Sequence, residues 1–231
     1  MTSASMKTPD RASRQPGALM QWIRRISVSG RFAVLGCVGL LMVAVPTTLY
    51  VQEARKATTV AKLEIEGLEP MAEIVKLIRL TQKHRTEAML GSTGGRLTDL
   101  QARIGESVAA LDKIVDGVGD PSLSSGWRNT VKAELPALLN GSAKDPAAAA
   151  KAFGQHGRMI DAQVRVQAML AEHYNLSLDP EASSYHLMLS LLVLLPKKIE
   201  ELAQAASRGA AILRDDTMSA EDRAILGLLP A

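Results

Sequence analysis

Residues 32–51 read FAVLGCVGLLMVAVPTTLYV, an apolar run of twenty residues that contains no charged side chain. An α-helix rises about 1.5 Å per residue, so a helix of this length crosses a hydrocarbon core of about 30 Å. The sequence therefore predicts one transmembrane helix near the N-terminus. The protein is expected to be anchored in a membrane, with lipid as its first partner.

The tail before this run is basic. Residues 1–31 contain six positive side chains and a single negative one, Asp10; the positive ones are Lys7, Arg11, Arg14, Arg24, Arg25 and Arg31. Cytoplasmic flanks carry the excess of Lys and Arg. We therefore expect a cytoplasmic N-terminus at a bacterial inner membrane, with residues 52–231 in the periplasm.

Two other interpretations of the run, a cleaved signal peptide and a lipoprotein site, fit its length less well. A cleaved signal peptide has an apolar region of about 7 to 15 residues, and this run is longer and follows a long tail. Val34-Leu35-Gly36-Cys37 resembles a lipoprotein site, but only five apolar residues precede Cys37 and the run continues beyond it. Cys37 is the sole cysteine, so an intramolecular disulfide is impossible.

Composition limits the kind of partner. The isoelectric point is near 9.1, but the excess charge belongs to the tail, because 21 positive and 23 negative side chains follow it. A basic tail beside a membrane span indicates anionic lipid rather than nucleic acid. Aromatic residues make up only 3% of the chain, which is typical of packed helices rather than of a β-rich domain.

Helical periodicity continues after the span. We expect the first helix to run to about residue 89, with a bend or a restart at Pro70. Further helices are expected at about 96–118, from Pro146 with Asp145 as its cap, and from Tyr185 onward. The predicted buried positions are Leu63, Leu68, Met71, Val75 and Ile78; Leu97, Leu100, Ile104, Val108, Leu111, Val115 and Val118; Phe153, Gly157, Ile160, Val164, Gln167, Ala171 and Tyr174; and Tyr185, Met188, Leu192, Leu195, Ile199, Leu202 and Ala206.

Breaks between the helices are expected at 91–95, 119–121, 140–142, 177–180 and 215–219, where Gly, Pro, Asn, Asp and Ser gather. A short helix is expected at 127–138, and Ser219 with Asp222 resembles a capping box for a last helix. Residues 187–195 are apolar but too few for a second span. The predicted fold is all-α: one transmembrane helix followed by an up-down helical bundle over 52–231, which we expect to be incomplete at its C-terminus.

No catalytic constellation is present in the sequence. It has no phosphate-binding Gly-rich loop with a following Lys-Ser/Thr, no cysteine pair and no HExxH. The histidines are spread over three predicted helices, so a metal site is not expected; they are His84, His156, His173 and His186. We expect neither an enzyme nor a cofactor.

Two polar clusters interrupt the apolar pattern. Gln82, His84 and Arg85 follow the stripe of the first helix, and Asp179 and Tyr185 lie in the stretch NLSLDPEASSY. These five residues are the candidate ligand-binding residues, because Arg matches carboxylate or phosphate and a free helix start can bind an anion. Three of them also have a structural interpretation: His84 as a neutral core histidine, Arg85 as a surface or ion-paired arginine, and Asp179 as a helix cap.

Both clusters also resemble a known family. The span followed by KLEIEGLEPMAEIVKLIRLTQKHR, and the later NLSLDPEASSYHLMLSLLVLLPKKIEELAQAASRG, resemble the periplasmic input region of bacterial methyl-accepting chemotaxis proteins and related sensor kinases. The elements are Gly67-Leu68-Glu69; Gln82, His84 and Arg85, with Thr86 where Gly is usual; and Leu178, Asp179, Pro180, Glu181, Ser184, Tyr185, Leu187, Met188, Leu195 and Pro196.

The resemblance implies a sensory input domain that acts as a homodimer and binds an unidentified small molecule or protein. It also implies parts that this sequence lacks, namely a second span, a relay segment and a cytoplasmic output domain. The alternative from the sequence is a membrane-anchored helical scaffold that binds other chains without sensing a ligand.

Topology gives the first prediction. A compartment-specific reporter fused after Arg55 should be active only on the periplasmic side, because the basic tail holds the N-terminus in the cytoplasm. Fusions of alkaline phosphatase and of a cytoplasm-active fluorescent protein at the same residue provide the measurement. Activity of the cytoplasmic reporter would contradict the orientation.

Overall fold

The computed structural model describes residues 27–92, 94–140, 146–177, 182–218 and 220–227. These residues form helices and no strand, which confirms the all-α expectation. The chain divides into two compact units, Met1–Thr58 and Thr59–Ala231, and each is described separately below.

The described part of the first unit belongs to α2, a helix that spans Val28–Met89. Among the described helices, α2 alone is long and apolar enough to cross a membrane, as judged by length and composition. Large apolar side chains are solvent-exposed in this unit; for example, Leu35 is 68% and Met42 is 74% exposed. Water is a poor solvent for such a surface, so the apolar run could lie in lipid.

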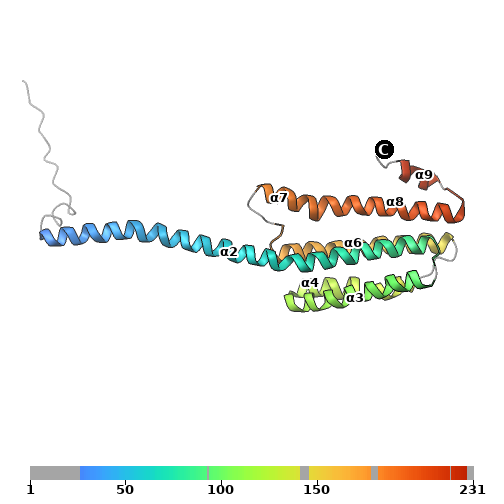
Figure 1. The fold of residues 1–231 in the computed structure, drawn as a ribbon, viewed down its shortest axis with the longest axis horizontal. Coiled ribbons are helices and arrows are strands. Elements are labelled where there is room, and N and C mark those ends of the chain that lie inside the picture. The colour runs from blue at the N-terminus through green and yellow to red at the C-terminus, as the bar shows by residue number, and fades with distance from the viewer. Residues whose placement is uncertain (1–26, 93, 141–145, 178–181, 219, 228–231) are drawn as a thin grey trace, which may run out of the picture. The chain divides into compact units, whose positions relative to one another are not determined.

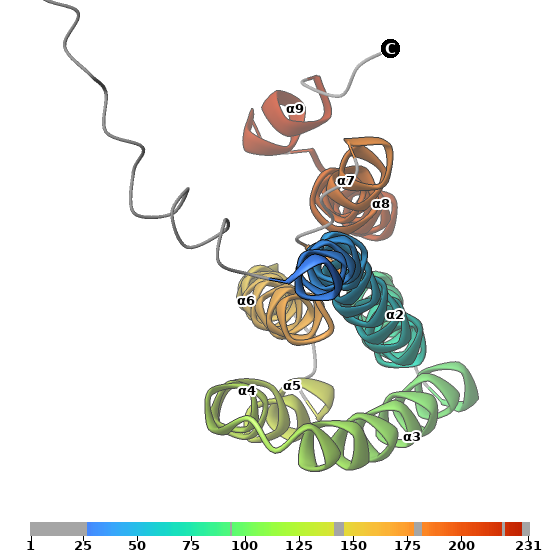
Figure 2. The ribbon, with the colours of Figure 1, turned by 90° about the vertical axis from the view of Figure 1, so that its left-hand side faces the viewer.

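The second unit contains the rest of α2 and the helices that follow it. They are α3 (Gly95–Val118), α4 (Pro121–Gly126), the π-helix η1 (Trp127–Lys132), α5 (Leu135–Leu139), α6 (Pro146–His173), α7 (Ala182–Leu189), the π-helix η2 (Ser190–Leu194), α8 (Leu195–Asp215) and α9 (Ala220–Gly227). In this unit α2 and α6 lie side by side, with α8 on one side of them and α3 to α5 on the other (Figures 1 and 2).

The expected breaks at 91–95, 119–121 and 215–219 are confirmed, whereas those at 140–142 and 177–180 lie largely outside the described residues. Gly91 and Gly94 separate α2 from α3, and Gly119 follows α3; all three have positive φ, which glycine adopts without steric cost. Asp120 caps α4 by accepting hydrogen bonds from the Ser122 and Leu123 amides. The short helix expected at 127–138 is instead two pieces, η1 and α5, and α4 comes directly before them.

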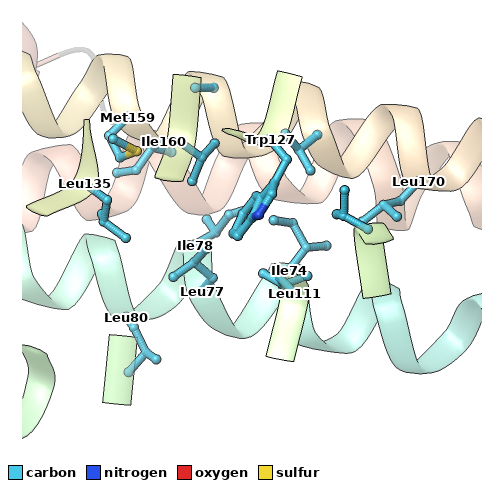
Figure 3. Packing of buried hydrophobic residues seen from close by; sticks show 14 of the residues in the cluster. Ile74, Leu77, Ile78, Leu80, Leu111, Trp127, Leu135, Met159, Ile160 and Leu170 are labelled. Atoms are coloured by element: carbon cyan, nitrogen blue, oxygen red, sulfur yellow. The ribbon is translucent and has the colours of Figure 1, made fainter. Parts of the chain in front are cut away.

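A hydrophobic core lies between α2, α3, α6 and the short helices. Ile74, Leu77, Leu111 and Leu170 are fully buried, and Trp127 fills the space between them (Figure 3). The indole Nε1 of Trp127 donates a hydrogen bond of 2.6 Å to Asp112, which also pairs with Lys132. The large indole surface is therefore buried while its one polar atom stays satisfied.

The predicted core positions of α3 and α6 are buried or half-buried where the structure describes them, which confirms both stripes. The α2 stripe is wrong at Leu68, which is 57% exposed, whereas Ile74, Leu77 and Leu80 lie deepest. Pro70 does not end the helix. The face of α2 was misplaced because this helix contacts elements on several sides, so a single narrow stripe underestimates its buried surface.

The seam predicted from Tyr185 to Ala206 is also wrong in part. Leu195 is 47% and Leu202 61% exposed, while Ala205 and Ala210 are buried instead. The reason is η2: Pro196 has no amide hydrogen, and the Leu195 amide bonds to the Ser190 carbonyl five residues back. One extra residue in a turn rotates the following positions by about 100°, which moves the seam off the buried face.

The end of α6 explains why α2 has a glycine at position 67. The Leu176 amide bonds to the Ala171 carbonyl and the Asn175 amide to the Glu172 carbonyl, while Asn175 has a φ of 58°; this is a Schellman cap. The turn brings Tyr174 against Gly67 of α2, where an added Cβ would lie 2.5 Å from the Tyr174 Cβ. Gly67 is thus required for the close approach of the two helices.

A matched pair of substitutions tests the core. Leu77→Ala should lower the free energy of unfolding by about 2 to 5 kcal/mol, because it removes a fully buried side chain and leaves a cavity. Leu202→Ala, at a position that is 61% exposed, should change it by less than about 1 kcal/mol. Chemical denaturation of the full chain in detergent micelles gives both values, and equal losses would show that the core is misassigned.

Candidate functional site

Three of the five candidate residues lie together in a buried polar layer. Gln82, His84 and Arg85 of α2 have exposures of 6%, 0% and 0%. Gln82 and Arg85 are three residues apart and share the face toward α8, whereas His84 points to α6. The layer therefore joins α2 to α6 and to α8.

Arg85 makes a complete set of contacts within the chain. Its two terminal nitrogens donate to the two carboxylate oxygens of Glu200, at 2.6 and 3.2 Å, and its Nε donates to the Ser207 hydroxyl at 3.2 Å. The guanidinium also lies 5.2 Å from the ring centre of Phe153. The interpretation of Arg85 as a surface residue is wrong; its geometry is that of a buried ion pair, which favours the structural interpretation over direct ligand contact.

Glu200 is the centre of this layer. Besides Arg85 it accepts hydrogen bonds from the amide nitrogens of Gln82 at 2.9 Å and Gln204 at 2.8 Å, so each carboxylate oxygen has two donors. Thr86 and Ser207 join hydroxyls at 2.9 Å beside it. This contact joins Thr86 of α2 directly to α8.

Sequence reasoning missed Glu200 and Ser207, although a signal was present. Glu200, Gln204 and Ser207 follow one another at spacings of four and three, so they form a polar stripe on a single face of α8. The stripe matches the one formed by Gln82 and Arg85 on α2. An acidic stripe opposite a basic one can pair two helices, but the match becomes visible only once the helices are known to be neighbours.

His84 and His156 form the second part of the layer. The His84 Nδ1 and the His156 Nε2 are 2.9 Å apart, and the two rings stack. The His156 Nδ1 lies 2.7 Å from the Ala152 carbonyl, which can only accept, so this nitrogen carries the proton. His156 Nε2 then accepts from His84, and both rings are neutral.

Burial keeps these histidines neutral. Desolvation lowers the pKa of His84. Desolvation also lowers the pKa of His156 from 6.5 to about 4; the hydrogen bond to the Ala152 carbonyl opposes this shift, and the electrostatic effects of His84 and Arg85 add to it. A proton added to this pair would lie beside the Arg85 cation in a dry environment. The prediction of a neutral core histidine at His84 agrees with this arrangement.

A cavity of about 550 Å³ lies next to the layer, beyond Phe153. Its walls include Met89, Phe153 and Arg208, and Arg208 pairs with Asp222 at 3.1 Å while lying 4.7 Å from the Phe153 ring centre. Its volume falls within the range of small-molecule sites. The layer is therefore close to a space in which a ligand could act on it.

The other two candidate residues cannot be placed. Asp179, and the side chain of Tyr185, lie outside the described part of the chain, as does the predicted cap Asp145. Among the described residues, no group of three or more His, Cys, Asp or Glu side chains could hold a metal ion.

Comparisons of the chain with protein-family models, with curated proteins and with solved structures gave no match. Function must therefore be argued from the polar layer and from the apolar helix that carries part of it.

The neutral histidines predict a loss of stability in acid. Between about pH 6.5 and about pH 4 the unfolded chain holds a proton on His156 that the folded chain does not, so stability falls as the pH falls through this window. The full effect is roughly 3 kcal/mol. Denaturant unfolding of the full chain at about pH 7 and about pH 5 measures the change.

The control removes a histidine from the same helix. His156→Gln should flatten the pH dependence of the free energy of unfolding, because a group that titrates differently in the two states is gone. His173→Gln, at an exposed position of α6, should leave it as in the wild type. An unchanged slope in the His156 variant would show that the pair is not held neutral.

Proposed function

We propose that this chain is the membrane-anchored sensory input domain of a bacterial transmembrane receptor of the chemotaxis type. In this proposal residues 32–51 span the inner membrane, the N-terminal tail is cytoplasmic, and a helical bundle in the periplasm binds a small molecule or a partner protein. The alternative is a membrane-anchored scaffold that binds other chains without converting a ligand into movement.

One observation carries the proposal: the helix that contains the apolar run also contains half of a buried ion pair. Arg85 and Gln82 of α2 bind Glu200 of α8, and all three are buried or nearly so. A buried charge is costly unless it is paired, so α8 cannot slide freely along α2. A shift of about one to two ångströms between packed helices is sufficient to bias a two-state output.

The polar layer is suited to such a shift because its bonds can be exchanged. Glu200 has four donors from three side chains, so one donor can be lost to a ligand while the carboxylate remains paired. A purely apolar contact offers no such discrete alternatives. The energetic difference between two arrangements of this kind is of the order that ligands supply, about 1 to 3 kcal/mol.

The surface of η2 and early α8 supports a homodimer within this proposal. Leu191, Val193, Leu194 and Leu202 are between 46% and 61% exposed, which leaves an apolar face in the second unit that no described helix covers. A second copy of the chain, held in the same membrane, could bury this apolar face. Anchoring both copies by α2 raises their effective concentration.

Helix displacement is the test of sensing. Spin labels at the exposed positions Lys83 and Ala206, introduced as Lys83→Cys and Ala206→Cys with Cys37→Ser, report the distance between α2 and α8. The full chain in lipid nanodiscs is screened against amino acids, organic acids and other small molecules by thermal shift. A compound that raises the melting temperature should move the label distance by about one to two ångströms.

Disruption of the ion pair provides the control. Arg85→Met should abolish the ligand-dependent movement, while Arg128→Met, which breaks the exposed pair with Asp116 away from α8, should leave it unchanged. Compounds or proteins that bind without any movement would favour the scaffold and contradict the sensory proposal.

A further inference from the structure

A second and smaller cavity lies between α2, α6 and the junction of η2 with α8, and its volume is about 60 Å³. Its walls are mostly apolar and comprise Val75, Ile78, Leu191, Leu195, Pro196 and Ile199. Three polar side chains complete it: Arg79, Gln82 and Gln167. An apolar chamber with a few converging polar groups is the usual form of a small-molecule site.

Gln167 is the informative residue of this cavity. It is 2% exposed, and neither its amide nitrogen nor its amide oxygen has a hydrogen-bond partner among the described residues. Buried amides are almost always bonded, since leaving both groups unpaired is costly. Gln167 therefore offers the cavity an unpaired donor group and an unpaired acceptor. A ligand that supplies an acceptor and a donor would satisfy both.

The charged side chains around the cavity favour an anionic ligand. Arg79 lines the cavity with an exposed side chain, and it has no hydrogen bond or ion pair to any described residue. The nearby carboxylate of Glu200 is neutralised by Arg85 and bonded by Gln82. A cation without a partner beside a satisfied carboxylate favours an anionic group on the ligand, and the fork of Arg matches a carboxylate.

The shape of the cavity follows from Pro196. Because this residue cannot donate an amide hydrogen, the backbone before it widens into the π-helix η2, and Leu191 and Leu195 line the cavity instead of closing over Gln167. Single π-turns within helices are often found at functional sites. The same residue that displaces the predicted seam thus opens the space.

We propose that this cavity binds a short-chain 2-hydroxy carboxylate. Its carboxylate accepts from Arg79 and from the Gln167 amide nitrogen, its hydroxyl donates to the Gln167 amide oxygen, and its methyl or methylene end contacts Leu191, Leu195 and Ile199. One water needs roughly 10 to 15 Å³ of such space, so the cavity of about 60 Å³ takes a molecule of four to six non-hydrogen atoms, as in glycolate or lactate.

This site deepens the proposed sensory function and, as a site for a signal, rests on it. The Gln82 side chain lines the cavity and bonds Glu200. A ligand in the cavity would therefore contact the polar layer from the side of α6 and could alter the contact between α2 and α8.

Calorimetric titration of the full chain in detergent micelles at neutral pH tests the proposal with three matched probes. Lactate carries both the charge and the hydroxyl, propionate lacks the hydroxyl, and lactamide lacks the charge. Lactate should bind at least about tenfold more tightly than lactamide and several-fold more tightly than propionate, as expected when one charged or one neutral hydrogen bond is lost.

Matched variants locate the binding. Gln167→Leu keeps the size of the side chain and removes both free polar atoms, and it should weaken lactate binding about tenfold or more. Arg79→Met should do the same. Gln163→Leu changes a buried glutamine on the same helix that bonds Thr81 and is not part of the cavity, so it should leave the affinity within about twofold.

Each remaining outcome decides the proposal. If Gln167→Leu fails to fold, Leu195→Trp at the half-exposed rim should block the cavity and weaken binding to the same degree. Absence of lactate binding, equal binding of lactamide, or an unchanged affinity in the Gln167 and Leu195 variants would overturn the site and leave water as the partner of Gln167. If lactate binds here but the distance between the spin labels does not change, the site is supported and the sensory function is contradicted. If lactate does not bind but another compound changes that distance, the sensory function is supported and this site is contradicted.

Discussion

The ion pair between Arg85 and Glu200 is the constraint on which the second unit depends. An arginine with no exposed surface must be neutralised and must have its donors bonded. Glu200 meets the first demand, and Ser207 contributes to the second. These bonds fix both the rotation and the axial position of α8 against α2, and they do so with directional contacts that apolar packing alone does not provide.

The two halves of the polar layer serve different ends. On the side of α8, Glu200 forms an ion pair with the Arg85 guanidinium. On the side of α6, His84 and His156 stay neutral because burial lowers their pKa values. The two imidazole rings have to stay neutral in this buried layer, since protonation of either ring would place a second positive charge beside Arg85. The histidines therefore depend electrostatically on the ion pair.

The π-helix before Pro196 connects the fold with the candidate chemistry. It rotates the apolar positions of α8 away from the core, leaves Leu195 and Leu202 exposed, and keeps a cavity open beside Gln167. One residue without an amide hydrogen accounts for all three features. The apolar face that no described helix covers and the cavity beside Gln167 are two places where another molecule, a second copy or a small ligand, could lower the free energy of the unit.

Local sequence patterns were sufficient to predict the apolar run of α2, the helical class, the stripes of α3 and α6 and the glycine breaks. These follow from periodicity and from the conformations that Gly and Pro allow, which depend on near neighbours only. The sequence also singled out Gln82, His84 and Arg85 as unusual. The burial of Arg85, the contact between His84 and His156 and the four hydrogen bonds to Glu200 follow only from the packing of the helices, because these partners lie 72 and 115 residues apart in the chain. Which polar residue pairs with which is set by the rotation of each helix, and the π-turn at Pro196 changed that rotation in a way that spacing alone does not reveal.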